Sequence, residues 1–440
     1  MERTPSSYKD PSSSVFFDSS SGKYFRSIQL GPEVYNSLGV FPKIGEHKQA
    51  NVFEVEKISF VNYHFEWTFE QFRDAALFYL ALLKDLDKKG FALSDATPLN
   101  ITYEGNGKFT FIDHGSLINK EEGQWTAFYQ FLKEYVYPLI YLSDQPLRIP
   151  LSLLPIISSK DWFFNYKPSF GKRINPKYWL VKSSLNLSAR KSLSDFDKKP
   201  AKAISNQYRY NLEFFTDYIR GIASPKLRNT RWGNYYSETV LTDGYVERKK
   251  EALLTLFNLI RYKVKLGLDI GGSDGEMAHH LVSNNEGLRF ICLESDPNAS
   301  VELYKRSQKT NLIPIYNSIY GLTPACGTSE CIPSLTKRLS GEVDLVMGLG
   351  IIHHMMNEEN LSHDNVLLYF KRLIKKDGFM LLEYVEPSDP RHKLIANPNY
   401  PYSKTILDWE TAVSKSGVII QKINVTDHRS LYLIKTSGNE

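Results

Sequence analysis

The clearest hydrophobic pattern in the chain is a short apolar run that changes into a helical repeat. Residues 266–270 have the apolar character of a buried strand, and Met277, Ala278 and Leu281 then recur at helical spacing. The residues between the two patterns are Gly271, Gly272, Ser273, Asp274 and Gly275. Glycine lets a backbone approach a ligand closely, and such turns follow the carboxyl ends of strands in parallel sheets. We therefore predict a strand, a ligand-binding turn and a helix.

Four more apolar runs follow at intervals typical of alternating strands and helices. We predict strands at 288–293, 313–316, 343–349 and 379–382, a short helix at 406–414, and two closing strands at 418–423 and 430–435 joined by a tight turn. The residues at the ends of the first four are Glu294, then Asn317 and Ser318, then Gly348, then Glu383. Open parallel sheets bind ligands at the carboxyl edge, so the pattern predicts an α/β fold with a site there.

The glycine turn does not have the spacing of a dinucleotide site. A G-x-G-x-x-G fingerprint requires glycine where Gly271, Ser273 and Glu276 stand, so two of three positions fail. We also expect Asp274 and Glu276 to repel a diphosphate, whereas a ligand with a positive charge and no phosphate, such as S-adenosylmethionine, is compatible with them. The alternative is that the glycines form a tight turn with no ligand.

The spacing of Asp269, Gly271, Ser273 and Gly275 resembles the first motif of class I S-adenosylmethionine-dependent methyltransferases, with Ser273 where many members have glycine. The resemblance implies a seven-stranded Rossmann-like sheet with an antiparallel last strand. It implies that Glu294 binds both ribose hydroxyls and that Asn317 and Ser318 contact the adenine. The full set of cofactor-binding residues that it implies is Asp269, Gly271, Gly272, Ser273, Gly275, Glu294, Asn317, Ser318 and Gly348, with no metal ligands.

Methyl transfer to a hydroxyl requires a positioned base in addition to alignment of the acceptor. His353 and His354 follow the strand predicted at 343–349, where the transferred methyl group should lie. We expect them in a turn, pointing in different directions, so that at most one faces the acceptor; the alternative for each is a capping or packing role. Glu383 is the third candidate for a catalytic role, and its alternative is a structural salt bridge.

The N-terminal half contains a second candidate motif after a well-defined helix. Thr68 and Gln71 form a capping-box signature, and apolar residues recur at helical spacing up to Gly90. Asp95, Asn100 and, after a hairpin, Asp113 follow in a spacing that resembles the catalytic and metal-binding loops of kinase-like phosphotransferases. Roughly 60 residues, part of them the tail, precede this kinase-like region, so we do not expect the whole upstream lobe, with a phosphate-covering loop and a lysine, that such enzymes need. Turn and capping roles for Asp95 and Asn100 are therefore favoured.

Longer segments resemble a bacterial class I methyltransferase family related to nodulation host-specificity proteins. The resemblance extends over about residues 50–150 and 225–435, and it includes a Trp-x-x-Tyr segment at 232–235 and a lysine-rich helix with Lys249 and Lys250. It implies S-adenosylmethionine as cofactor and O-methylation of a sugar, a glycan or a related small metabolite.

The composition changes this picture little. A chain of 440 residues predicts several domains, which we place at 1–22 (disordered tail), 23–160 (α+β, with the kinase-like fragment), 161–228 (basic linker and helical connection) and 229–440 (methyltransferase). The net charge of +5 is too small to indicate a nucleic-acid partner. We expect a cytoplasmic protein without a membrane span; the oligomeric state and the acceptor are not determined by the sequence.

Three function classes therefore stay open. The first is a methyltransferase. The second is a phosphotransferase-methyltransferase fusion that uses ATP and magnesium at Asp95, Asn100 and Asp113. The third is a non-catalytic protein that binds the cofactor.

Overall fold

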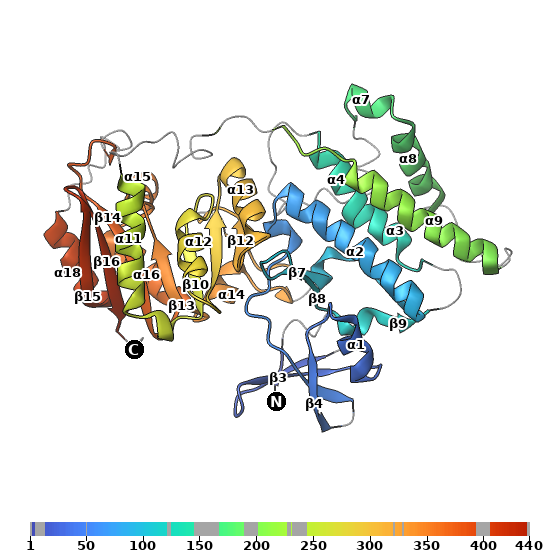
Figure 1. Ribbon diagram of the computed structural model, residues 1–440, viewed down its shortest axis with the longest axis horizontal. Helices are drawn as coiled ribbons and strands as arrows, with labels where there is room; N and C mark the ends of the chain where they lie inside the picture. The colour runs from blue at the N-terminus through green and yellow to red at the C-terminus, as the bar shows by residue number, and fades with distance from the viewer. Residues whose placement is uncertain are drawn as a thin grey trace. The chain divides into compact units, whose positions relative to one another are not determined.

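The computed structural model describes residues 2–4, 14–49, 51–120, 125–144, 167–188, 201–226, 230, 244–319, 322–327, 330–392 and 405–437. The chain divides into two compact units (Figure 1). The N-terminal unit comprises residues 1–103, 109–228 and 327–332, and the C-terminal unit comprises 104–108, 229–326 and 333–440. None of the helices that the structure describes has the length and apolar character needed to cross a bilayer.

The C-terminal unit is built on a mixed sheet of seven strands in the order β12-β11-β10-β13-β14-β16-β15. Strands β10 to β14 run parallel, and β16 is antiparallel to both of its neighbours. This arrangement confirms the predicted Rossmann-like sheet with an antiparallel last strand. The strands are β10 (Leu266–Ile270), β11 (Arg289–Glu294), β12 (Leu312–Tyr316), β13 (Val343–Gly348), β14 (Ile374–Val385), β15 (Gly417–Thr426) and β16 (Arg429–Thr436).

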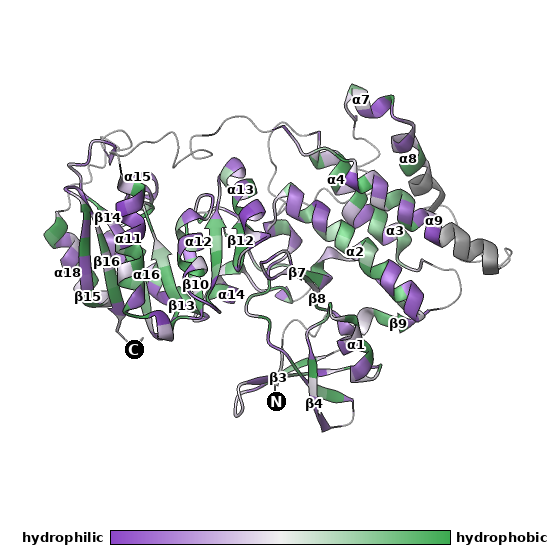
Figure 2. Ribbon diagram, viewed as in Figure 1, coloured by the Kyte–Doolittle hydropathy of each residue, from purple (hydrophilic) through white to green (hydrophobic). Residues whose placement is uncertain are grey.

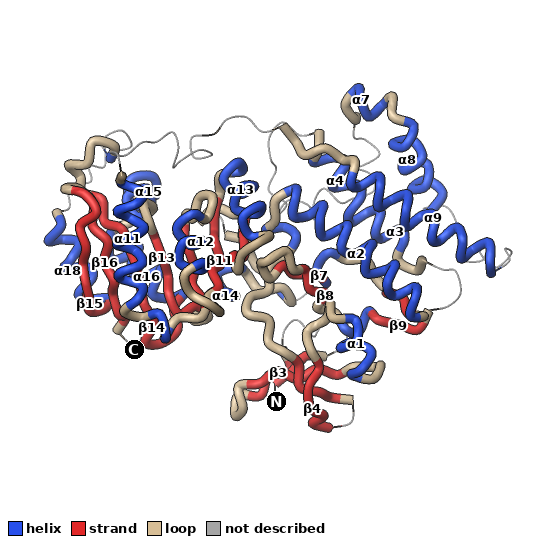
Figure 3. Tube along the Cα trace, in the orientation of Figure 1, coloured by secondary structure: helices blue, strands red, loops and turns tan. Residues whose placement is uncertain are grey.

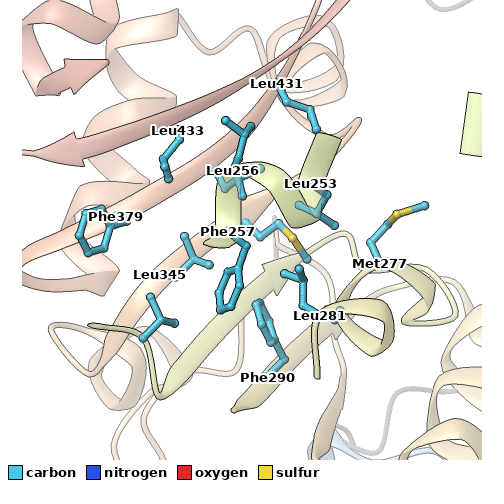
Figure 4. Close-up of a cluster of buried hydrophobic side chains, with 14 of the residues drawn as sticks. Leu253, Leu256, Phe257, Met277, Leu281, Phe290, Leu345, Phe379, Leu431 and Leu433 are labelled. Atoms are coloured by element: carbon cyan, nitrogen blue, oxygen red, sulfur yellow. The ribbon is translucent and has the colours of Figure 1, made fainter. Parts of the chain in front are cut away.

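Helices cover both faces of this sheet, whose central strands are largely hydrophobic (Figures 2 and 3). On one face, Leu253 and Phe257 pack with Leu281 and Phe290 in a buried cluster (Figure 4). On the other face, Trp409 stacks on Tyr384 with ring centroids 5.5 Å apart. The helices are α11 (Tyr245–Asn258), α12 (Glu276–Ser283), α13 (Pro297–Ser307), α14 (Leu335–Leu339), α15 (Ile352–Glu359), α16 (His363–Leu373) and α18 (Ile406–Ser416).

The strand order identifies where a ligand should bind. From β10 the chain adds β11 and β12 on one side, and it then returns to place β13 on the other side of β10. This reversal is a topological switch point, and ligands of open α/β sheets bind beside the carboxyl ends of the strands at such a point. In this chain the relevant ends are those of β10 and β13.

The N-terminal unit begins with a five-stranded antiparallel sheet in the order β1-β2-β3-β5-β4. Its elements are β1 (Glu2–Arg3), β2 (Val15–Asp18), β3 (Lys23–Ser27), α1 (Pro32–Leu38), β4 (Ile44–Gln49) and β5 (Val52–Val55). The prediction of a disordered tail is wrong for the described part of residues 1–22. Phe16 and Phe17 pair with Phe25 and Tyr24 on β3. The prediction failed because it followed the serine-rich composition around these residues instead of the short apolar run that they form.

The remainder of the N-terminal unit is mainly helical with two short strand pairs. The predicted helix is confirmed as α2: the Thr68 hydroxyl accepts a hydrogen bond from Gln71 N, and Gly90 ends the helix with φ 78°. Strand β6 pairs with β9, and β7 pairs with β8. The elements are α2 (Phe69–Lys89), β6 (Phe91–Leu93), β7 (Ile101–Tyr103), β8 (Phe109–Phe111), β9 (Leu117–Asn119), α3 (Phe128–Phe131), α4 (Tyr137–Leu142), α7 (Phe170–Arg173), α8 (Pro176–Ser188) and α9 (Ala201–Arg220).

Candidate functional site

The glycine turn connects β10 to α12, and every second residue from Gly271 to Gly275 has a left-handed backbone conformation. Gly271, Ser273 and Gly275 have φ of 71°, 51° and 79°. A Cβ on Gly271 would lie 3.1 Å from the Ile351 side chain, and one on Gly275 would lie 2.5 Å from Leu303. The turn is therefore a closely packed glycine cradle at the switch point, in which Gly271 N and Gly272 N donate to the Leu293 carbonyl at 2.9 and 3.2 Å.

Glu294, at the end of β11, is bonded to this turn. Its Oε2 accepts a hydrogen bond from Ser273 N at 2.7 Å, and its Oε1 accepts from Ser295 N and Asp296 N at 2.7 Å each. Burial raises the pKa of Glu294, and these backbone donors act in the opposite direction. The hydrogen bond to Ser273 explains how a non-glycine residue is held at positive φ.

Asp269 lies beneath the same turn. Its side chain is buried at 2% exposure, and a Cβ on Gly272 would lie 3.0 Å from its Oδ2. Burial raises the pKa of Asp269 to about 7, with Lys249 acting against this shift. A positively charged ligand group at the turn would favour the ionised form of this carboxyl.

The two acids at the start of α12 are neutralised by basic partners. Arg306 Nη2 lies 2.8 Å from Asp274 Oδ2, and Arg306 Nη1 lies 2.6 Å from Glu276 Oε2. Lys250 is a second partner of Glu276. The expected repulsion of a diphosphate by these acids therefore does not hold, and the argument against a dinucleotide rests on the glycine spacing alone.

The ends of β12 and β13 complete the carboxyl edge of the seven-stranded sheet. Asn317 N donates to the Glu294 carbonyl at 2.9 Å, and Ser318 N donates to Asn317 Oδ1 at 2.8 Å. A Cβ on Gly348 would lie 3.2 Å from the side chains of Leu382 and Phe370. All nine predicted cofactor-binding residues thus belong to β10, β11, β12 and β13 or to the turns at their carboxyl ends.

The histidine pair lies on α15, so the prediction that it occupies a turn is wrong; the helix begins directly after Ile351. His353 and His354 are buried, with ring centroids 4.4 Å apart. His354 Nδ1 lies 2.9 Å from Glu358 Oε1, one helical turn later. His353 Nδ1 is buried without a hydrogen-bond partner, and burial lowers the pKa of His353 well below its usual value.

Glu383 is fully buried in a network of charged side chains. Lys249 Nζ lies 2.7 Å from its Oε2, and the Tyr245 hydroxyl donates to its Oε1 at 2.5 Å. Burial acts to raise the pKa of Glu383, but Lys249 and Arg429 hold it below its usual value. Side chains alternate along β14, so Glu383 shares the face of Phe379 and Leu381 and meets α11. This contact is the structural role weighed for Glu383 from the sequence.

The structure adds residues that sequence reasoning missed. Asn357 Nδ2 lies 2.9 Å from His392 Nε2, and the His392 ring centroid lies 5.8 Å from that of His353. Asp389, in the same loop after β14, accepts from Arg429 Nε at 2.8 Å. Prolines at 387 and 390 favour a loop here, but no periodic pattern in the sequence assigns the partners of its side chains.

Thr230 anchors the start of the Trp-x-x-Tyr segment, which itself lies outside the described residues. The Thr230 hydroxyl donates to Asp296 Oδ1 at 2.9 Å and accepts from Asn298 Nδ2 at 2.8 Å. Asp296 is the N-cap of α13 and lies two residues after Glu294. The chain therefore enters this unit beside the carboxyl edge of the sheet, where the candidate site lies.

The kinase-like motif residues also come together, within the N-terminal unit. Asn100 Nδ2 lies 2.9 Å from Asp95 Oδ1 and 3.3 Å from Asp113 Oδ2. Among the residues that the structure describes, no group of three or more His, Cys, Asp or Glu side chains has the arrangement of a metal site. The convergence of Asp95, Asn100 and Asp113 is thus a finding, whereas a phosphotransferase activity is not shown by it.

Comparison with known proteins gives one sequence relative and several structural similarities. No protein-family model matches the chain. The nodulation protein NoeA of Rhizobium meliloti (strain 1021) is 25% identical over 356 residues, which are 77% of this chain and 72% of NoeA.

Two solved structures illustrate the structural similarities. An O-methyltransferase family protein from Burkholderia thailandensis is 12% identical with a TM-score of 0.31, covering 44% of this chain and 60% of that protein, less than two thirds of its length. An S-adenosylmethionine-dependent methyltransferase from Clostridium acetobutylicum is 11% identical with a TM-score of 0.32, covering 47% of this chain and 96% of that protein. The fold assignment rests on the strand order, because similarities at this level carry little weight.

Proposed function

We propose that the C-terminal unit is an S-adenosylmethionine-dependent methyltransferase. The observation that supports this most strongly is the Glu294 carboxylate bonded to Ser273 N of a glycine cradle at the switch point of the sheet. In the proposed complex, the cradle lies against the cofactor, Glu294 accepts from the ribose, and Asn317 and Ser318 contact the adenine. The cofactor, when bound, would supply an electrophilic methyl carbon.

The base that we propose is His354. A histidine whose Nδ1–H donates to a carboxylate is held in one orientation, and its other ring nitrogen becomes more basic. Glu358 provides such a carboxylate at 2.9 Å. His354 would take the proton of the acceptor hydroxyl as the acceptor oxygen bonds to the methyl carbon and the methyl–sulfur bond breaks, with its electron pair leaving on the sulfur. His353, which lacks a carboxylate partner and is kept neutral by burial, is proposed as a positioning residue.

The proposed acceptor is a hydroxyl group of a sugar, a glycan or a related small metabolite. A hydroxyl acceptor is supported by the histidine and carboxylate pair, because a hydroxyl must lose a proton during methylation. Glu383 is not assigned a proton-transfer role in this proposal, since it is the ionised partner of Lys249.

A label-transfer assay tests this proposal. The full chain is incubated with methyl-labelled S-adenosylmethionine and a panel of monosaccharides, oligosaccharides and small phenols, and binding of S-adenosylhomocysteine is measured in parallel. The proposal predicts label transfer that His354→Ala lowers at least tenfold without loss of binding. Binding without transfer to any acceptor, and without an effect of His354→Ala, would instead identify a non-catalytic cofactor-binding protein.

A further inference from the structure

A group of polar side chains in the N-terminal unit has no part in methyl transfer. One loop of this unit joins β6 to β7 and contains Asp95 and Asn100; another joins β8 to β9 and contains Asp113 and Ser116. Because β6 pairs with β9 and β7 pairs with β8, the two loops are held next to each other. The pairing of these strands therefore brings together polar residues from two different loops.

The contacts in this cluster bring the carboxylates of Asp95 and Asp113 to shared hydrogen-bond donors. The Ser116 hydroxyl oxygen lies 2.7 Å from Asp95 Oδ1 and 2.7 Å from Asp113 Oδ2. A hydroxyl has one proton and can donate to one of these oxygens at a time. Asn100 and Ser116 are buried, at 4% and 3% exposure, beneath the partly exposed carboxylates of Asp95 and Asp113. Two adjacent carboxylates next to buried polar side chains favour a bound cation.

Arg26 adds a fixed positive charge from the five-stranded sheet. Its Nη2 lies 2.8 Å from Asp113 Oδ1, and its Nη1 donates to the Ile112 carbonyl. Arg26 is 9% exposed, so its guanidinium is held in place. A guanidinium bonded to one carboxylate of an adjacent pair matches a ligand that brings both phosphate oxygens and a metal ion.

The surrounding fold supplies independent support. Residues 14–56 form the larger part of an antiparallel sheet with α1 inserted between β3 and β4, so the expectation that no folded lobe precedes the motif is wrong. In protein kinases the phosphate-binding lysine is on the third strand, a D-x-x-x-x-N loop carries the base and a magnesium ligand, and a later Asp holds magnesium. Arg26 is on the third strand here, Asp95 and Asn100 have the same spacing, and Asp113 follows the hairpin.

Two differences from the kinase pattern are clear in the sequence. Arginine stands where kinases have lysine, and residues 5–13, between β1 and β2, contain no glycine and lie outside the described residues. The first difference preserves the charge. The second is a difference of sequence: these residues lack the glycines of the loop that covers the phosphates in kinases.

We propose that the N-terminal unit binds a nucleoside triphosphate with Mg²⁺ and transfers its terminal phosphoryl group to a hydroxyl acceptor. Asp113 and Asn100 hold the metal ion, which needs only one or two carboxylates when phosphate oxygens supply other ligands. Arg26 binds the phosphates. The acceptor oxygen forms a bond to the terminal phosphorus, the bridging P–O bond breaks with its electron pair leaving on the nucleoside diphosphate, and the acceptor proton passes to Asp95.

The test uses the full chain and ATP as the probe, with water as the surrogate acceptor. Calorimetry should detect ATP binding in the presence of Mg²⁺ that weakens at least tenfold with EDTA or in Asp113→Asn. Asp95→Asn should keep the binding but lower the release of labelled terminal phosphate at least tenfold. Asp85→Asn is the matched control, because Asp85 is an exposed residue of α2 whose side chain is 66% accessible; it should change neither quantity.

Several results would overturn this inference. They are the lack of ATP binding by the unmodified chain, binding that is the same with Mg²⁺ and with EDTA, and binding with no release of labelled phosphate. The comparison of Mg²⁺ with EDTA needs no variant, so it decides the question even if Asp113→Asn fails to fold after losing the partner of Arg26.

Discussion

Lys249 Nζ lies 2.7 Å from Glu383 Oε2, and the two side chains are 1% and 0% accessible to solvent. This buried ion pair joins the first turns of α11 to the carboxyl end of β14. Tyr245, one helical turn before Lys249, bonds the other oxygen of the same carboxylate. The end of β14 is therefore fixed by charge and hydrogen bonds as well as by apolar packing.

Replacing one member of this pair should be costly. Lys249→Met removes the cation 2.7 Å from the buried Glu383 carboxylate and leaves Arg429, 4.0 Å away, as a weaker partner, so we expect the free energy of unfolding to fall by about 3–5 kcal/mol. Lys249→Met combined with Glu383→Leu should recover most of this loss, because no unpaired charge stays buried. Denaturant unfolding followed by circular dichroism measures both.

The control for this comparison is Lys305→Ala, which breaks an exposed pair with Glu302. Surface pairs contribute little, so the free energy of unfolding should change by less than about 1 kcal/mol. Equal effects of Lys249→Met and Lys305→Ala would contradict the structural importance of the buried pair.

The two histidines of α15 should differ in their effect on turnover. A positioned base contributes roughly 10²- to 10⁴-fold, so His354→Ala should reduce kcat within that range. Glu358→Gln should cause a smaller loss and change the pH profile of kcat, because it removes the charged partner 2.9 Å from the imidazole that takes the proton in the proposed mechanism. The His353→Ala, His354→Ala double variant should lose at least tenfold in turnover and still bind S-adenosylhomocysteine. A pH profile that is the same in Glu358→Gln and the parent enzyme argues against His354 as the base.

Asp269 should make cofactor binding depend on pH. Its pKa is about 7 because of burial, and a cationic ligand favours the ionised form. Below pH 7 binding must expel a proton, so affinity should fall by up to about tenfold for each pH unit. Calorimetric titrations of S-adenosylmethionine from pH 5.5 to 8.5 measure this slope, and Asp269→Asn should abolish it.

Asp269 should also make the free energy of unfolding depend on pH. The carboxyl has a pKa near 3.8 when unfolded and about 7 when folded, so between these values the unfolded chain binds fewer protons than the folded one. The contribution of Asp269 to the free energy of unfolding therefore falls as pH rises from about 4 to 7 and is constant above that range. In Asp269→Asn this fall should be absent. If the free energy of unfolding of this variant depended on pH in the same way as that of the parent, Asp269 would be ionised in the folded parent.

Gly275 should tolerate alanine less well than Gly287, although both have positive φ, at 79° and 77°. The strain of a left-handed residue costs about 1–2 kcal/mol at either position. A Cβ on Gly275 would also lie 2.5 Å from Leu303 Cδ1, whereas one on Gly287 meets no atom within 4 Å. Thermal unfolding should therefore show a larger loss of stability for Gly275→Ala. Equal losses would mean that Leu303 can move aside without cost.

Strands β10 to β13 were predictable because each is a short, mainly apolar run that ends in polar or glycine residues. The run at 266–270 and the glycines after it fix β10 and its turn, and Glu294 follows β11 as expected. The pairings of charged residues were not predictable. Arg306 lies about 30 residues from Asp274, and no local pattern indicates that helix α13 brings it to the turn.

The N-terminal sheet shows a different limit of sequence reasoning. Val15, Phe16 and Phe17 form a strand although serines and aspartates surround them, because pairing with β3 determines the structure of such a short segment. The Asp95 and Asp113 motif was visible in the sequence, but its approach to Arg26 depends on that sheet. Long-range pairing of strands therefore decides which motif residues share a site.

The most direct test of the methyltransferase proposal is calorimetric titration of the full chain with S-adenosylhomocysteine, comparing the parent chain with Glu294→Ala. We predict saturable binding to the parent with one ligand per chain, and at least tenfold weaker binding to Glu294→Ala while its unfolding transition stays cooperative. Undetectable binding to the parent, or equal affinity in the two proteins, would contradict the proposed cofactor site.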